Sequence, residues 1–322
     1  MQERIDRQPF DPETFVEHLR RAADAIEAPV AESRTRRLLA LYDSELRSCV
    51  VQLKATDRPG SGVYYRFFYN GPLDLTARAQ EAGLLPSDGS PIIELQREIL
   101  GTFDGATRAG LDFDSGFGLA KVWTYTGGPI PVDRIYALGS LPESVRAHAR
   151  FFERFGLRDV YFTASDHQGD SMNVYFGWDP ACRNAAWIRQ MLSETGSEPV
   201  PDVILDEILR SQAVAGGVGC TFYWNRPGLG RWCLYSLEIP YASGAPAWVC
   251  RPRLPNRLAR FRDLTPTLNQ EPQFNVAWSF GRAGTYVKLE KSYARDATFF
   301  LTHEMGGDLS HPEPTPETAS RR

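Results

Sequence analysis

Five strand-like segments of the chain carry a positively charged residue near their middle. These cations are Lys54, Arg66, Lys121, Arg231 and Lys288. Lysine and arginine side chains bind phosphate oxygens through charge-assisted hydrogen bonds. If the fold brings these segments together, the sequence predicts a site for a phosphorylated ligand that carries two or three negative charges, as a diphosphate does.

The cations belong to a pattern that recurs five times. Pairs of strand-like runs, joined by a short turn rich in glycine or polar residues, begin near residues 48, 107, 158, 216 and 274. The period is about 51 to 59 residues, and units of this size generally bury their apolar faces only against their neighbours. Helical patterns precede the strand pairs, as residues 11–27 and 33–46 precede the runs at 49–56 and 62–70.

The remaining segments repeat this order of helices followed by two strands. The expected helices span residues 73–82, 92–100, 142–155, 183–194, 203–211 and 254–262. The expected strands span residues 109–113, which read weakly, and 118–126, 159–166, 172–178, 218–224, 232–239, 275–280 and 285–293. Because helices would cover only one face of the sheet, ten antiparallel strands should close into a barrel with an open lumen.

The predicted fold class is therefore α+β: a ten-stranded antiparallel barrel of five ααββ repeats with the helices outside. We expect one domain over residues 1–305. Residues 306–322 lack any periodic pattern and are expected to form a disordered tail.

Alternation along the strands predicts which side chains face the lumen. The cations share their faces with polar and aromatic residues, in the sets Gln52 and Lys54; Tyr64, Arg66 and Phe68; Leu119, Lys121, Trp123 and Tyr125; Asn173 and Tyr175; Arg231, Cys233 and Tyr235; Tyr286, Lys288 and Glu290. The opposite faces are apolar and suit a covering of helices: Val51, Leu53, Phe67, Val122, Val174, Phe176, Val287 and Leu289, with Trp278 assigned there by pairing across the turn at 281–284.

A single cation in a strand is most often a solvated surface residue, and a single aromatic residue most often fills a core. Here the same combination recurs on non-adjacent strands whose other face is apolar. Several unpaired buried cations together would be costly, which indicates an anionic ligand. Aromatic rings beside such a cluster can also stabilise a carbocation and shield it from water.

Composition limits the classes of protein and ligand. The chain is 42% hydrophobic and 24% charged, as in soluble globular proteins. Its net charge of −4 argues against a general nucleic-acid binder. It has neither a signal-peptide pattern nor an apolar run long enough to span a membrane. The scattered cysteines and histidines suit neither disulfides nor a metal site, so we expect a cytoplasmic protein without a metal, and a monomer by default.

Three stretches of the sequence resemble a known family. They are FFERFGLRDVYFTASD with MNVYF (151–176), GLAKVWTY (118–125) and FNVAWSFGRAGTYVKLEKSY (274–293). They resemble the soluble aromatic prenyltransferases of the ABBA, or PT-barrel, type, and among these the 4-hydroxyphenylpyruvate dimethylallyltransferases of aminocoumarin antibiotic pathways. The likeness covers nearly the full chain. It implies a barrel of five ααββ units and transfer of a dimethylallyl group from dimethylallyl diphosphate to an electron-rich aromatic molecule in secondary metabolism.

The resemblance also implies roles for single residues. Residues that match diphosphate-binding positions are Lys121, Asn173, Tyr175, Arg231 and Lys288. Lys54 and Arg66 match cations of the aminocoumarin branch that lie near the donor and the acceptor respectively or are shared between them, and we expect both to bind the diphosphate. Glu290 matches a carboxylate proposed as the catalytic base or as an anchor for the acceptor hydroxyl; the alternative is an ordinary ion pair with Lys288 or Lys291. Residues expected to shield the carbocation or contact the aromatic substrate are Tyr64, Phe68, Trp123, Tyr161, Cys233 and Tyr286.

Three positions depart from the pattern of the family. Arg66 stands where some members hold Mg²⁺ with an aspartate, so no metal should be needed, and Asp112 and Asp114 do not form a metal-binding aspartate cluster. Tyr161 stands where the 4-hydroxyphenylpyruvate enzymes have an arginine suited to the acceptor's carboxylate, which argues against a keto-acid acceptor. Gly169 replaces a lysine of the geranyl-using branch.

The resulting hypothesis assigns ionisation of the allylic diphosphate to the cations and proton acceptance to Glu290, kept ionised by Lys288 and Lys291. Two other functions remain open. A non-catalytic barrel that binds an anionic aromatic or prenyl ligand would need no carboxylate at Glu290. A phosphatase acting on the same diphosphate would need a nucleophile or metal site, and none is evident. The sequence leaves the acceptor, the regiochemistry and the length of the donor undetermined.

Overall fold

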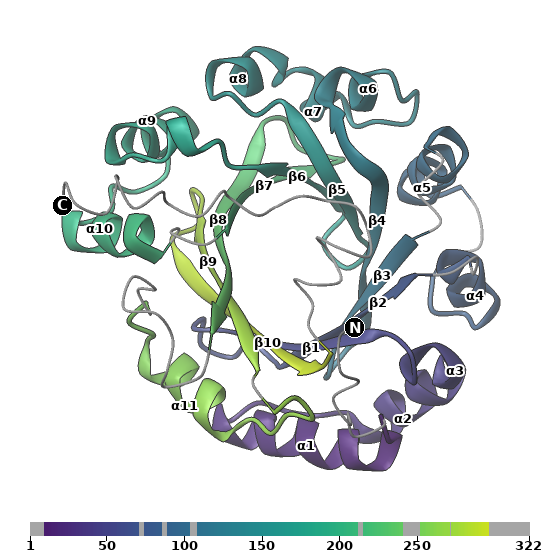
Figure 1. The fold of residues 1–322 in the computed structure, drawn as a ribbon. Helices are drawn as coiled ribbons and strands as arrows, with labels where there is room; N and C mark the ends of the chain where they lie inside the picture. The colour runs from purple at the N-terminus through teal and green to yellow at the C-terminus, as the bar shows by residue number, and fades with distance from the viewer. Residues whose placement is uncertain are drawn as a thin grey trace, which may run out of the picture.

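The computed structural model describes residues 10–70, 74–85, 89–103, 108–211, 215–240, 252–270 and 272–295. Within these ranges ten strands close into one barrel, in the spatial order β1-β10-β9-β8-β7-β6-β5-β4-β3-β2. Every neighbouring pair is antiparallel. Figure 1 shows the barrel from one end, with the helices arranged around its outside. The predicted fold class is confirmed.

The strands are β1 Val50–Thr56, β2 Tyr64–Asn70, β3 Arg108–Asp114, β4 Gly118–Pro131, β5 Asp159–Asp166, β6 Ser171–Gly177, β7 Ala215–Tyr223, β8 Leu229–Pro240, β9 Gln273–Phe280 and β10 Tyr286–Ala294. The described helices are α1 Pro12–Ala25, α2 Glu32–Leu41, α3 Asp43–Leu46, α4 Leu75–Glu81, α5 Pro91–Thr102, α6 Val132–Tyr136, α7 Glu143–Arg146, α8 Ala149–Arg154, α9 Ala185–Thr195, α10 Asp202–Ser211 and α11 Asn256–Leu264, with a 3₁₀ turn, η1, at Pro180–Cys182.

Two predicted helices differ in detail from the structure. The helix expected over 33–46 is divided into α2 and α3 at Tyr42, which leaves helical geometry (φ −116°, ψ 25°) and packs its ring 5.3 Å from that of Phe67. The helix expected over 142–155 is replaced by α7 and α8, and the short α6 before them was not predicted. The tail predicted at 306–322 lies outside the described residues.

Helix α1 begins as its sequence directs. Asp11 caps it by accepting a 2.8 Å hydrogen bond from the Thr14 amide, and Pro12 occupies the first turn, where no amide hydrogen is needed. The helix packs against α11, so the first and last repeats also meet in the helical layer. Arg257 of α11 strengthens this junction by donating to the carbonyls of Ile26, Thr56 and Ser61.

The two faces of the barrel wall differ as predicted. The apolar set between the strands and the helices is buried, including Val51, Leu53, Phe67 and Trp278. Leu119 also lies in this outer cluster, so its predicted position in the lumen was wrong. The reason is a register shift in the pairing of β3 with β4, which places one extra residue, Ala120, in β4.

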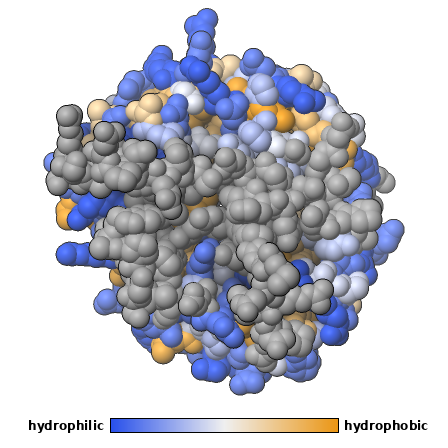
Figure 2. Space-filling view, viewed as in Figure 1, coloured by the Kyte–Doolittle hydropathy of each residue, from blue (hydrophilic) through white to orange (hydrophobic). Residues whose placement is uncertain are grey.

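A separate and smaller aromatic cluster occupies the inner face: Val50, Phe68, Trp123, Tyr125, Phe162 and Ala164. The outside of the molecule is different in character, since hydrophilic residues predominate around the rim of the face shown in Figure 2. No helix among the described residues is long and apolar enough to cross a bilayer.

Candidate active site

Opposite charges face one another across neighbouring strands on the inner wall. The directly paired positions are Glu290 with Lys54, Arg66 with Asp112, Asp112 with Lys121, and Lys121 with Asp166. Cations and carboxylates therefore face one another at four cross-strand pairs on six neighbouring strands, an arrangement that stabilises the pairing. The pairing register of β1 to β5 and β10 creates this belt from residues that are far apart in the sequence.

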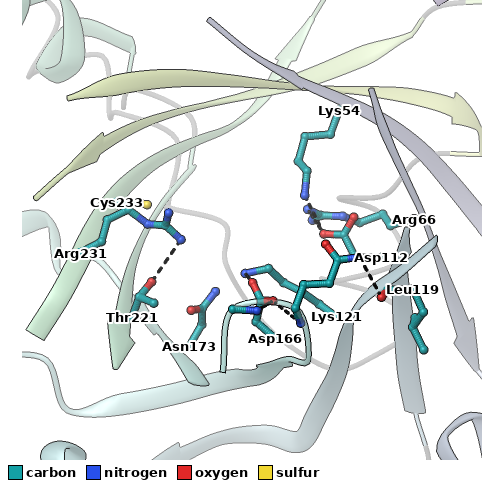
Figure 3. A network of polar contacts seen from close by, with 12 residues as sticks. Lys54, Arg66, Asp112, Leu119, Lys121, Asp166, Asn173, Thr221, Arg231 and Cys233 are labelled. Atoms are coloured by element: carbon teal, nitrogen blue, oxygen red, sulfur yellow. Dashed lines mark hydrogen bonds and ion pairs between the residues drawn. The ribbon is translucent and has the colours of Figure 1, made fainter. Parts of the chain in front are cut away.

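Asp112 is the centre of the belt. Its Oδ2 atom lies 2.6 Å from Lys54 Nζ and 3.2 Å from Arg66 Nη2, and its side chain is 1% exposed. The same Arg66 nitrogen lies 3.0 Å from Glu290 Oε1. Lys121 pairs separately with Asp166 at 2.9 Å. Figure 3 shows Lys54 and Arg66 converging on Asp112, with the Lys121–Asp166 pair beside them.

These pairs correct the expectation that the cations are unpaired. From the sequence, Asp112 was weighed only as part of a metal-binding cluster, which its spacing excluded, and Asp166 was not predicted as a site residue. A signal existed, because each aspartate falls on the cation-bearing face of its strand once the register is known. Burial alone would raise the pKa of Asp112, but Lys54 and Arg66 lower it below its ordinary value. The carboxylate is therefore held ionised.

Arg231 and Lys288 form no ion pair with a carboxylate among the described residues. Arg231 donates to the Tyr286 hydroxyl at 2.6 Å and to Thr221 Oγ1 at 3.5 Å. Lys288 Nζ lies 3.2 Å from Cys233 Sγ. The described residues that line the polar part of the lumen thus include six cations, the five predicted ones and Arg58, against three carboxylates.

The surplus positive charge acts on its neighbours. Burial by itself would raise the pKa of Tyr286, but Lys288 and Arg231 lower it. The same two cations lower the pKa of Cys233 against the effect of burial. Both groups therefore sense an uncompensated positive potential, which is the environment that an anionic ligand requires.

The lumen contains two connected chambers. The polar chamber, of about 950 Å³ including its open mouth, is lined by all five cations together with Asp112, Asp166 and Asn173. The apolar chamber, of about 580 Å³, is lined by Phe68, Tyr161, Phe162 and Leu237, with Gln52 and Asn275. Five residues line both and define the neck between them: Arg66, Trp123, Tyr175, Tyr235 and Glu290.

Aromatic rings and one guanidinium form the neck. Trp123 stacks on Tyr175, with 4.6 Å between ring centroids and 26° between planes. The Arg66 guanidinium carbon lies 4.6 Å from the centroid of the Trp123 ring. The Tyr175 hydroxyl accepts a 2.8 Å hydrogen bond from Asn173 Nδ2, which fixes the ring. This aromatic passage is where a cation leaving the polar chamber would be stabilised and kept from water.

The structure brings most of the predicted site residues together. Tyr64 and Tyr286 line the polar chamber, where Lys54 Nζ lies 4.6 Å from the centroid of the Tyr64 ring. Phe68 and Tyr161 line the apolar chamber. Cys233 lines neither chamber and is buried beside Lys288.

The expected surroundings of Glu290 were partly wrong. Lys291 faces the helices, where its Nζ donates to the carbonyls of Arg262 and Thr265 at 2.7 Å each. Adjacent residues of a strand point to opposite faces, so Lys291 cannot influence Glu290 from inside the lumen. The ion-pair partner of Glu290 is Arg66, at 3.0 Å.

Among the aromatic residues of the chambers that received no predicted role are Tyr235 and Phe162. Tyr235 stood in an inward-facing set, but its place in the neck was not foreseen. Phe162 lines the apolar chamber next to Tyr161 because the pairing of β5 with β6 shifts register between Val160 and Phe162. Strict alternation would have placed it outside.

No group of three or more histidine, cysteine or acidic side chains stands ready for a metal ion among the described residues. The carboxylates of Asp112 and Asp166 instead contact lysine and arginine nitrogens. The arrangement suits binding and ionisation of an organic diphosphate beside an apolar chamber for a second molecule.

Comparisons with known proteins agree with this geometry. Residues 10–303 match the family Aromatic prenyltransferase Orf2. The chain is 34% identical over 296 residues to a 4-hydroxyphenylpyruvate 3-dimethylallyltransferase of Streptomyces niveus, covering 92% of this chain and 88% of that protein. It is 33% identical over 290 residues to an aromatic prenyltransferase of Sclerotinia sclerotiorum, covering 88% and 91%.

The fold is also similar to that of solved structures. A 6-dimethylallyl tryptophan synthase superposes with a TM-score of 0.54 at 17% identity, over 89% of this chain and 100% of that one. A complex of NotF with brevianamide F and DMSPP gives a TM-score of 0.50 at 12% identity, over 90% and 97%. The chain therefore belongs to the aromatic prenyltransferase Orf2 family, and it is an enzyme that transfers prenyl groups to aromatic molecules.

Proposed function

We propose that this enzyme transfers a dimethylallyl group from dimethylallyl diphosphate to an electron-rich hydroxyaromatic small molecule, without a metal, in secondary metabolism. The observation that carries the proposal is a polar chamber with surplus positive charge that opens through an aromatic neck into an apolar chamber. The S. niveus relative is named for dimethylallyl transfer, which supports the choice of donor.

The diphosphate is bound in the polar chamber. Arg231 and Lys288 lack carboxylate partners among the described residues and supply the attraction, with Lys54, Lys121, Asn173 and Tyr175 also lining this chamber. When the allylic C–O bond breaks, its electron pair stays with the diphosphate oxygen. The fixed cations stabilise the negative charge that develops there.

The allylic carbocation then lies in the neck. Trp123 and Tyr175 line both chambers at this point, while Tyr64 and Tyr286 line the polar chamber, on the side of the leaving group. Aromatic faces attract a cation and exclude the water that would otherwise capture it.

The acceptor stacks in the apolar chamber against Phe68, Trp123 and Tyr161. A carbon of its ring attacks the cation, a C–C bond forms, and the proton on that ring carbon is lost. Glu290, in the neck, orients the acceptor's hydroxyl or N–H and accepts a proton. Since Glu290 lines both chambers, it can reach an acceptor while the donor is still bound.

A divalent ion is not required in this scheme, because protein cations compensate the diphosphate charge. Arg66 and Lys54 are held in place by Asp112 and offer hydrogen-bond donors to the diphosphate, and the Arg66 guanidinium keeps its charge at any working pH. Full activity in the presence of EDTA is the expected result. We also infer that the enzyme is a cytoplasmic monomer. Size-exclusion chromatography with light scattering tests the oligomeric state.

The decisive experiment incubates the protein with dimethylallyl diphosphate, EDTA and a panel of phenols, dihydroxynaphthalenes, phenazines and indoles, and analyses the products by mass spectrometry. A prenylated acceptor supports the proposal. Ligand binding without turnover would favour a non-catalytic barrel, and prenyl alcohol without an acceptor product would favour a phosphatase. Geranyl diphosphate, run in parallel, tests the donor length.

A further inference from the structure

Among the described residues, the lining of the apolar chamber has no surplus charge. Its lining contains one cation, Arg66, and one carboxylate, Glu290, which pair with each other at 3.0 Å. Behind them Lys54 and Asp112 form a second pair at 2.6 Å, so the whole group of four is neutral. Three cations that form no ion pair with a carboxylate among the described residues, Arg58, Arg231 and Lys288, line only the polar chamber.

This division of charge directs the anionic donor to the polar chamber and an uncharged acceptor to the apolar chamber. An anion gains attraction in the polar chamber. In the apolar chamber a carboxylate would lose its hydration and would lie near Glu290 without an unmatched cation to compensate it.

The side chain of Gln52 indicates which polar group the acceptor carries. It lies in the middle of β1, opposite Arg66 on β2 and Ser292 on β10. It is 2% exposed and lines the apolar chamber. Among the hydrogen bonds between described residues, none involves the Gln52 amide. The amide is therefore open to the chamber, and its N–H and C=O groups together suit a neutral polar group of a ligand.

Gln52 and Glu290 can contact the same molecule. Glu290 lies on β10 two residues from Ser292, which makes it the diagonal neighbour of Gln52 on the inner face. Such positions are roughly 7–8 Å apart. Two substituents of one aromatic molecule can span that distance.

We infer, on the basis of the proposed function, that the natural acceptor is an uncharged arene. Its hydroxyl or N–H meets Glu290, and a neutral carbonyl or carboxamide substituent hydrogen-bonds to Gln52. Acceptors that carry a carboxylate in place of that substituent are selected against. This specificity would differ from that of the S. niveus relative, whose name specifies a keto acid.

The test uses pairs of acceptors that differ only in this substituent: 4-hydroxyphenylacetamide with 4-hydroxyphenylacetate, and 1,4-dihydroxy-2-naphthamide with 1,4-dihydroxy-2-naphthoate. Isothermal titration measures their binding to the enzyme saturated with dimethylallyl S-thiolodiphosphate, which does not ionise readily. We expect each amide to bind about tenfold or more tightly than its acid. Equal binding, or tighter binding of the acids, would overturn the inference.

Two variants test whether Gln52 and the charge of the apolar chamber cause the preference for amides over acids. Gln52→Met keeps the size of the side chain but removes its polar groups, so the amides should lose about tenfold in affinity while the acids are unchanged. Gln190→Met, on the exposed face of α9, is the control and should alter neither. Tyr161→Arg introduces a cation into the apolar chamber and should improve binding of the acids about tenfold. It is an independent test should Gln52→Met fail to fold.

Turnover with dimethylallyl diphosphate, measured on the same compounds, separates this inference from the proposed function. Selective binding of the amides with no prenylated product would refute the transferase scheme and leave the specificity intact. Efficient prenylation of acid and amide alike would support the transferase scheme and refute the proposed selectivity for uncharged acceptors.

Discussion

The Lys54 ammonium and the Asp112 carboxylate lie 2.6 Å apart inside the barrel, although 58 residues separate them in the sequence. Arg66 approaches the same carboxylate oxygen at 3.2 Å. Asp112, in the wall of the polar chamber, thus holds two cations in fixed positions. A buried network of this kind stabilises the fold only while its charges balance.

Asp112→Asn should destabilise the protein because it leaves two buried cations with only Glu290 to balance them. Breaking a buried pair costs roughly 3–5 kcal/mol in free energy of unfolding, which urea denaturation measures. Inorganic diphosphate should restore part of the loss by supplying negative charge. Asp43→Asn is the control, because its pair with Arg47 is exposed and should contribute less than about 1 kcal/mol. Equal losses in the two variants would contradict this account.

The affinity for the donor should fall as pH rises through about 8. Burial lowers the pKa of Lys54 to about 8, even beside Asp112. Diphosphate binds the charged form, so above that pH binding must take up a proton, and affinity falls by up to about tenfold per pH unit. Titration calorimetry in two buffers of different ionisation enthalpy measures this proton uptake.

The lowered pKa of Lys54 weakens donor binding at high pH, but it makes the free energy of unfolding larger as pH rises. Between pH 8 and pH 10.5 the unfolded chain holds a proton on Lys54 that the folded protein has released, so this group stabilises the fold as pH rises across that window. In Lys54→Arg the side chain stays charged across this pH range, so the pH dependence of donor affinity and that of stability should both disappear. Identical pH profiles for the wild type and Lys54→Arg would show that another group titrates.

Glu290→Gln should slow catalysis without weakening donor binding. The amide keeps the shape of the side chain but loses its charge and its ability to accept a proton, which lowers kcat by about 10²–10⁴-fold. Removing the negative charge beside Arg66 leaves the polar chamber at least as attractive to diphosphate. Steady-state kinetics and calorimetry separate the two effects, with Glu194→Gln, in a surface pair with Arg154, as control. Undiminished turnover would exclude Glu290 from the chemistry.

Gly219→Ala should disturb the neck. A β-carbon at this position would lie 3.0 Å from Tyr175 Cε1 and 3.2 Å from Tyr235 Cε2, so both rings must move. Because Trp123 stacks on Tyr175, we expect kcat/KM to fall about tenfold, and overpacking to cost roughly 1–3 kcal/mol of stability. Gly101→Ala is the matched control, since nothing lies within 4 Å and helix propensity there improves. A neutral effect of Gly219→Ala would mean that the rings adapt freely.

The sequence alone determined the repeat, the class of fold and, where the strands are regular, the face that meets the lumen. These are local properties, since the side-chain period of a strand is two residues and each repeat carries its own pattern. For that reason Lys121, Arg231, Lys288 and Trp123 could be assigned to the interior without knowledge of their neighbours.

The tertiary structure decided which charges meet. The contact of Lys54 with Asp112 joins β1 to β3 across β2, and it depends on a register that no single strand encodes. Irregular pairing also turned Phe162 inward and Leu119 outward. Alternation holds only within an unbroken strand, whereas register and bulges arise when the closed barrel must satisfy all of its strand pairs at once.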